Sequence, residues 1–114
     1  MASAKEVLNG YDQLLGGVGP DFGLFQDFIA MCMKGYEVST LDYLTCQLIL
    51  ICVVSAINSS ETIIFSHVRM YVEGGGKRED LVSALNMCIM ACGGPGLAWG
   101  AAALKAYDEL TAEK

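Results

Sequence analysis

The chain has 114 residues, a length typical of a single domain with one hydrophobic core. Its formal net charge is -6 at pH 7, which opposes binding to nucleic acid or to anionic lipid because both require clustered Lys and Arg. Hydrophobic residues make up 54% of the chain and charged residues only 18%, so there are more apolar side chains than one small core can hide. We therefore expect subunit interfaces, with no nucleic acid and no membrane as partners.

The cysteines and the longest apolar run bear on compartment and membrane association. An odd number of cysteines, without zinc-like spacing and without a preceding signal peptide, fits reduced thiols and predicts a cytoplasmic protein. The apolar run at residues 44–57 is too short to cross a membrane and contains Gln47, so it predicts a buried helix. The five cysteines are Cys32, Cys46, Cys52, Cys88 and Cys92.

Glycine and proline divide the chain into helix-sized pieces, and almost nothing in it has the alternation of a strand. A first amphipathic helix is predicted over about 3–15. A second is predicted to begin at Asp21, directly after Pro20, and to stop at Gly35. Its apolar residues recur at helical spacing: Phe22, Phe25, Phe28, Ile29 and Cys32.

The third helix is predicted to start at Ser39 and to continue to about residue 57. Ser39 and Asp42 match a capping box, which makes Asp42 a structural rather than a catalytic residue. A fourth helix follows a cap at Asn58, Ser59 or Ser60 and ends at the three glycines of residues 74–76, one of which can take the left-handed conformation.

A fifth helix is predicted over about 78–91, with Glu79 and Asp80 in its first turn, where the helix dipole favours acids. The last runs from Pro95 or Gly96 to about residue 112, and its small residues predict close packing within the core or between subunits. Together these elements predict one all-α domain of about six helices over residues 1–114, with no internal linker or repeat.

His67, the chain's single histidine, falls on an apolar face of the fourth helix. That face also carries Ile63, Ile64, Val68 and Tyr71. Burial there disfavours the charged imidazole, and the ring needs a hydrogen-bond partner. Two interpretations stay open: a satisfied core histidine, which is the commoner case, and a functional acid or base.

Gln47 has a similar apolar setting on the third helix. The simplest hypothesis is that Gln47 and His67 hydrogen-bond each other across the two helices, one fixing the tautomer of the other. The alternative is an amide near a helix end that faces solvent.

Three stretches carry a resemblance to a known family. "YEVSTLDYLTCQLILICVVSAI", "SHVRMYVEGGGKREDLVSAL" and "MACGGPGLAWGAAALKAYDEL" together resemble the carboxymuconolactone decarboxylase family, also called alkylhydroperoxidase D-like. The resemblance covers about 22–110 and rests on the order and spacing of the pieces. It implies a single-domain orthogonal array of helices that assembles as a homo-oligomer, commonly a trimer or hexamer, with pockets near subunit boundaries.

Peroxidase members of this family resemble one another in a Cys-x-x-Cys placed just before the histidine. The corresponding positions here are Ser60 and Ile63, so we expect no dithiol peroxidase chemistry of that kind. For Cys88 and Cys92, one helical turn apart, structural packing is the preferred interpretation. A redox protein that uses a cysteine outside the usual motif remains an alternative.

Decarboxylase members release carbon dioxide from a carboxylated lactone without a metal or organic cofactor, and the resemblance implies that their histidine and glutamate correspond to His67 and Gln47. The enolate that remains requires hydrogen-bond donors and a proton, and Tyr43, one turn before Gln47, can contribute a hydroxyl to the substrate. The resemblance thus implies a cofactor-free lyase acting on a small lactone or organic acid, with His67 as acid/base. The alternative is a non-catalytic oligomeric binding protein in which the histidine and glutamine form a polar network. Arg69 faces away from His67 and could serve only a neighbouring subunit's pocket; an interface ion pair or a solvated side chain is the preferred interpretation.

Overall fold

The computed structural model describes residues 2–112, and these contain six α-helices, one short 3-10 helix and no strand. The predicted all-α architecture is therefore confirmed. No helix in the described part of the chain is long and apolar enough to cross a membrane. The elements are α1 (Ala4–Val18), η1 (Gly19–Asp21), α2 (Phe25–Val38), α3 (Tyr43–Ala56), α4 (Glu61–Glu73), α5 (Arg78–Cys92) and α6 (Gly94–Thr111).

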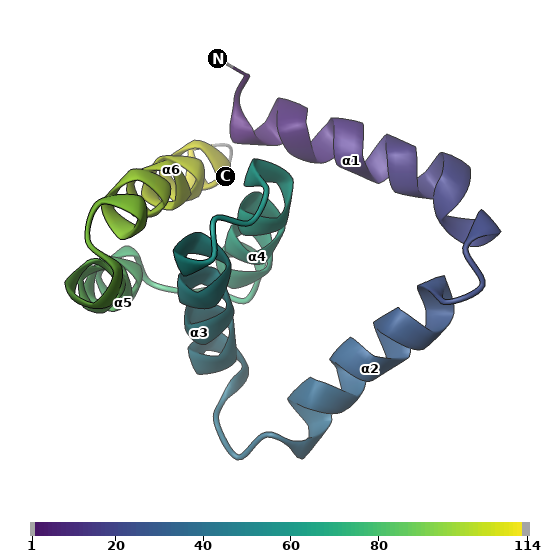
Figure 1. The fold of residues 1–114 in the computed structure, drawn as a ribbon, viewed down its shortest axis with the longest axis horizontal. Coiled ribbons are helices and arrows are strands. Elements are labelled where there is room, and N and C mark those ends of the chain that lie inside the picture. Colours follow the sequence, from purple (N-terminus) through teal and green to yellow (C-terminus); the bar gives the residue numbers. More distant parts are fainter. Residues whose placement is uncertain (1, 113–114) are drawn as a thin grey trace.

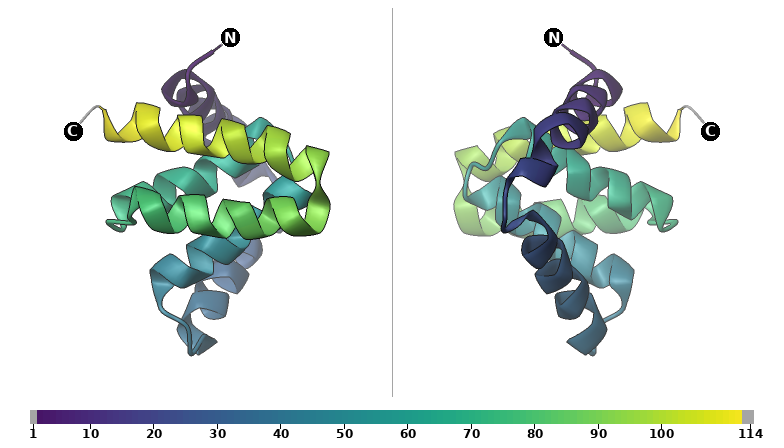
Figure 2. Two further views of the ribbon diagram at one scale, coloured as in Figure 1. Left: turned by 90° about the vertical axis from the view of Figure 1, so that its left-hand side faces the viewer. Right: turned by 90° about the vertical axis from the view of Figure 1, so that its right-hand side faces the viewer.

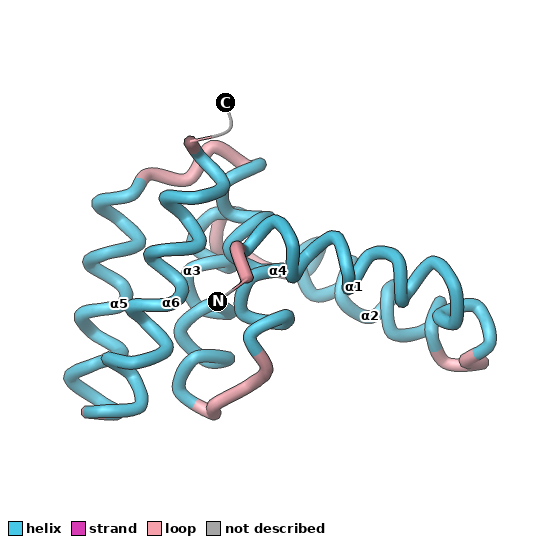
Figure 3. Tube along the Cα trace, turned by 90° about the horizontal axis from the view of Figure 1, so that it is seen from above, coloured by secondary structure: helices cyan, strands magenta, loops and turns pink. Residues whose placement is uncertain are grey.

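Helices α3 to α6 pack on one another and form the body of the molecule (Figure 1). Figure 2 shows α5 and α6 side by side, the most closely packed pair. Helix α1 packs on α4 and α6, and the backbone N–H of Ala4 donates to Oε2 of Glu109 at 3.2 Å. Figure 3 shows α1 and α2 extending to one side of the body as an arm. Helix α2 buries none of its residues.

The core is built from one apolar face of each packed helix. Leu8 of α1, Ile51 of α3, Val68 of α4, Leu81 of α5 and Ala103 of α6 are all at most 2% exposed. Burying a side chain of the size of Leu, Ile or Val contributes about 1.5–3 kcal/mol, which gives these contacts more weight than intrinsic helix propensity.

The small residues at the start of α6 bring it close to α5. A Cβ built on Gly96 would lie 3.1 Å from the carbonyl oxygen of Cys88, and one on Gly100 would lie 3.6 Å from the Leu85 side chain. Of the two predicted uses for this small-residue face, packing within the core is the one found here.

The turn after α4 uses its three glycines as predicted. Gly74 is the C-cap, and Gly75 has φ +85°, the left-handed conformation that favours glycine. Gly76 is buried: its N–H donates to the Tyr71 carbonyl at 2.9 Å, and its own carbonyl accepts from the Tyr107 hydroxyl at 2.8 Å.

The predicted limits of the first two helices were wrong. Helix α1 continues past residue 15 through Gly16 and Gly17, and Asp21 lies in η1 rather than at the start of α2. Helix α2 passes through Gly35 and ends at Val38. A glycine inside a helix costs only about 1 kcal/mol relative to alanine, so it does not by itself end one.

The cap of α3 also differs from the prediction. Ser39 is the C-cap of α2, whereas Asp42 is the N-cap of α3, its Oδ1 accepting from the Thr45 N–H at 2.7 Å. The structural role predicted for Asp42 is confirmed, although its position in the cap was wrong. Ser60 is the N-cap of α4 and accepts from the Ile63 N–H at 3.2 Å.

Candidate functional site

Gln47 and His67 meet where α3 packs against α4. Nδ1 of His67 lies 3.2 Å from Oε1 of Gln47, and Gln47 is fully buried. The hydrogen bond predicted between them is therefore present. It arises because the apolar faces of the two helices pack together, which places these two polar groups opposite each other.

Tyr36, near the end of α2, is the third member of this network. Nε2 of Gln47 donates to the Tyr36 hydroxyl oxygen at 2.7 Å, and that hydroxyl donates to Sδ of Met70 at 3.9 Å, a weak acceptor. The sequence interpretation missed Tyr36 because it ended the helix at Gly35. Had the helix been continued, Tyr36 would have stood one turn after Cys32, at the end of the apolar face.

The hydrogen bond to Gln47 indicates which nitrogen of the His67 ring carries a proton, and burial indicates the charge of the ring. Oε1 of an amide only accepts, so Nδ1 of His67 carries the proton that it donates to Gln47. Burial lowers the pKa of His67 from its ordinary value because the charged ring loses solvation. At neutral pH the ring is therefore neutral, with the lone pair on Nε2.

Tyr43, the predicted substrate-binding residue, lies beside Tyr36. Their ring centroids are 5.2 Å apart at an interplanar angle of 52°. Tyr43 is 43% exposed, and burial of the rest of its side chain is the main cause that raises its pKa. At neutral pH the phenol is therefore protonated, and its side chain is partly open to solvent.

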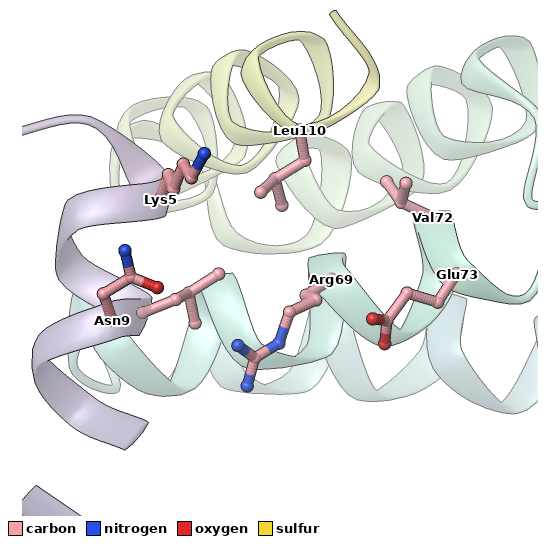
Figure 4. Close-up of a pocket in the computed structure, with 7 residues that line it drawn as sticks. Lys5, Asn9, Arg69, Val72, Glu73 and Leu110 are labelled. Atoms are coloured by element: carbon pink, nitrogen blue, oxygen red, sulfur yellow. The ribbon is translucent and has the colours of Figure 1, made fainter. Parts of the chain in front are cut away.

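Arg69 lies on the side of α4 that faces α1, away from this network. Its guanidinium donates to both carboxylate oxygens of Asp12, at 2.9 and 3.1 Å, so Arg69 forms an ion pair within the chain, where a pair at a subunit interface was expected. A cavity of about 310 Å³ lies between α1, α4 and α6 (Figure 4). A second, of about 550 Å³, lies beside the loop between α4 and α5. His67 lines neither of them.

Three cysteines, Cys52, Cys88 and Cys92, lie close together where α3 packs against α5. Sγ of Cys52 donates to the Ala84 carbonyl at 3.4 Å, and Sγ of Cys88 donates to the Cys52 carbonyl at 3.6 Å. Burial, the largest cause, and the neighbouring thiols raise the pKa of Cys52 to about 11, and burial also raises that of Cys88. Reactive thiolates need the opposite shift, which supports the packing interpretation of Cys88.

A scan against protein-family models and a search of curated proteins find no match. Among solved structures, the chain is similar to the apo crystal structure of a carboxymuconolactone decarboxylase family protein from Legionella pneumophila. The TM-score is 0.88 at 24% sequence identity, covering 95% of this chain and 96% of that one. The chain has the fold of that family protein. The resemblance seen in the sequence is therefore confirmed for the fold.

Ser60 and Ile63, which the sequence resemblance aligned with the peroxidase cysteines, have a structural role in this fold. Ser60 caps α4, and the amide of Ile63 is the group that it caps. Among the described residues, no group of three or more His, Cys, Asp or Glu side chains is arranged to hold a metal ion. The groups available for chemistry at the α3–α4 junction are the imidazole of His67, the amide of Gln47 and the phenols of Tyr36 and Tyr43.

Proposed function

We propose that the protein is a cofactor-free, decarboxylase-like lyase acting on a small carboxylated lactone or a related organic acid. The observation that carries this proposal is the network in which Gln47 connects Tyr36 to His67. The Gln47 carbonyl occupies Nδ1 of His67, which leaves Nε2 to exchange a proton with a ligand. Burial keeps the imidazole neutral until a ligand arrives.

Binding of a carboxylate near Nε2 would favour the protonated ring, because an opposite charge at close range stabilises imidazolium. His67 then takes up one proton from solvent. When the carbon–carbon bond to the carboxylate breaks, its electron pair stays on the lactone as an enolate and carbon dioxide leaves. Nε2 then gives its proton to the carbon, and the ring returns to the neutral state.

The developing negative charge on the enolate oxygen requires hydrogen-bond donors. The side chain of Tyr43 is 43% exposed and can supply one, and the O–H of Tyr36 donates only to the weak sulfur acceptor of Met70. Gln47 can orient His67 but cannot transfer a proton itself at neutral pH. The proposal therefore assigns all proton transfer to His67.

One observation favours a second candidate, a non-catalytic binding protein. Gln47 and Nδ1 of His67 are already hydrogen-bonded inside one chain, and neither cavity described above is lined by His67. A satisfied polar network of this kind can serve packing alone.

We also propose that the protein is a homo-oligomer, such as a trimer or hexamer. Phe28, Met31 and Met33 of α2 are 58–62% exposed, and the helix buries none of its residues within the chain. An apolar helix that stands away from the body (Figure 3) marks a contact surface. In sedimentation, the native mass should be a multiple of 12.2 kDa and should fall in Phe28→Ser; a monomer at micromolar concentration would refute the assembly.

The test of the proposed reaction is release of carbon dioxide from carboxymuconolactone by the purified protein. We expect turnover above background, at least about a hundredfold less in His67→Ala, which is the usual contribution of a general acid or base. Arg78→Gln, which removes an exposed ion pair with Asp108, is the control and should keep full activity. Absence of turnover in the wild type, or full activity in His67→Ala, would leave the binding protein as the better account.

A further inference from the structure

We infer that Tyr36 is a positioning residue of this site: its hydroxyl holds the Gln47 amide in the orientation that keeps the proton of His67 on Nδ1. The catalytic meaning of this inference rests on the proposed function. Its test reads the histidine directly and does not depend on turnover.

The Gln47 amide has two orientations that can connect Tyr36 to His67. In the observed one, Oε1 accepts from Nδ1–H of His67 and Nε2 donates to the Tyr36 oxygen. In the flipped one, Oε1 would accept from the Tyr36 hydroxyl and Nε2 would donate to Nδ1. The proton of the neutral imidazole would then have to be on Nε2. The orientation of one amide thus decides which ring nitrogen carries the lone pair.

The surroundings of Tyr36 distinguish these two orientations. In the observed one, the Tyr36 oxygen accepts from Gln47 at 2.7 Å and its O–H donates to Sδ of Met70 at 3.9 Å, so both functions of the hydroxyl are used. In the flipped one, the O–H would turn to Gln47, and Met70 would lose its donor. The Gln47 amide is paired with Tyr36 and His67 in both orientations, so the hydrogen bond from Tyr36 to Met70 is what favours the observed one.

Tyr36 connects helix α2 of the arm directly to the site. It belongs to α2, which buries no residue, yet it contacts Gln47 of α3, Met70 of α4 and the ring of Tyr43. A displacement of α2 from the body would therefore release the amide of Gln47. The proton of the neutral His67 ring should then no longer be restricted to Nδ1.

The consequence for chemistry is a change in the role of the imidazole. With the proton on Nδ1, Nε2 accepts a proton when a carboxylate binds and returns it to the product carbon. With the proton on Nε2, the neutral ring can only donate there, and Nδ1 is blocked by the amide. Tyr36 thereby selects the acid–base form that the proposed reaction needs.

Nitrogen NMR on protein labelled with ¹⁵N-histidine tests the inference, because His67 is the only histidine in the chain. At pH 8 the ring is neutral, and the shifts and couplings of its two nitrogens report the tautomer. We expect the wild type to show Nδ1–H in roughly threefold excess or more, since the flipped amide would cost the hydrogen bond from Tyr36 to Met70. In Tyr36→Phe each amide orientation leaves one amide atom without a partner, so the two tautomers should be about equally populated.

Two further variants keep the result interpretable. Tyr107→Phe removes a phenol hydrogen bond of 2.8 Å to Gly76 elsewhere in the core and should leave the tautomer unchanged. Met70→Leu keeps Tyr36 but removes its sulfur acceptor, and should lower the Nδ1–H excess even if Tyr36→Phe fails to fold. An Nε2–H wild type, an unchanged tautomer in Tyr36→Phe and Met70→Leu, or an equal change in Tyr107→Phe would overturn the inference.

Discussion

Replacing Gln47 by glutamate would place a carboxylate against the imidazole and should raise the pKa of His67. In the wild type, Oε1 of Gln47 lies 3.2 Å from Nδ1 and carries no net charge, and burial lowers the pKa of the ring. A charge pair at 4 Å interacts by about 4 kcal/mol at an effective dielectric constant of about 20. One pH unit of pKa corresponds to about 1.4 kcal/mol, so an attraction of this size corresponds to about 3 pH units before desolvation is counted.

Desolvation opposes that rise. Residue 47 is fully buried, which favours the neutral carboxylic acid, although the Tyr36 hydroxyl could turn and donate to the new carboxylate. We therefore expect the pKa of His67 in Gln47→Glu to rise by about 1 to 3 pH units above that of the wild type. Because the two groups interact strongly, the protons will leave in steps that belong to the pair.

The assay is an NMR titration of the single imidazole between pH 4 and 9. Gln47→Leu is the control: it removes the same hydrogen bonds without adding charge, and it should not raise the pKa of His67. A Gln47→Glu protein whose imidazole titrates at or below the wild-type value would refute the placement of the two side chains. In the decarboxylation assay, Gln47→Glu also shows whether an acid at this position increases turnover.

Three further outcomes follow from the described geometry. Gly76→Ala should destabilise the fold by about 1–3 kcal/mol in urea unfolding, because the new Cβ would overlap the buried ring of Tyr71; an unchanged midpoint would contradict this packing. Burial lowers the pKa of His67 in the folded protein, so the unfolding free energy should fall as the pH drops from 6.5, the unfolded value, through the lower folded value. His67→Gln should lose this dependence. An identical pH profile of stability in both proteins would count against the burial of the ring. Burial raises the pKa of Cys52 to about 11 and also raises that of Cys88, so both thiols should stay unmodified when the native protein is exposed to mild peroxide. Mass spectrometry can check this. Rapid oxidation of either thiol would support the redox alternative.

The body of the fold could be predicted from local patterns. From Asp42 to Thr111, apolar periodicity, helix-capping residues and glycine stops act within a few residues of one another, so the four helices follow with small errors at their ends. The pairing of Gln47 with His67 could be anticipated for a related reason. Each is the polar exception on an apolar face, and buried polar groups on packed faces need partners.

The arm and the full network depended on tertiary structure. Because Gly35 lowers the helix propensity of α2 locally, the amino-acid sequence did not predict that the helix continues to Tyr36, or that Tyr36 hydrogen-bonds Gln47 on α3. Nor does periodicity reveal that the apolar face of α2 is left exposed within one chain, or that Arg69 pairs with Asp12 on α1. Local sequence set which faces are apolar, whereas the geometry between helices decided which polar groups meet, since contacts between distant segments depend on how all the helices pack at once.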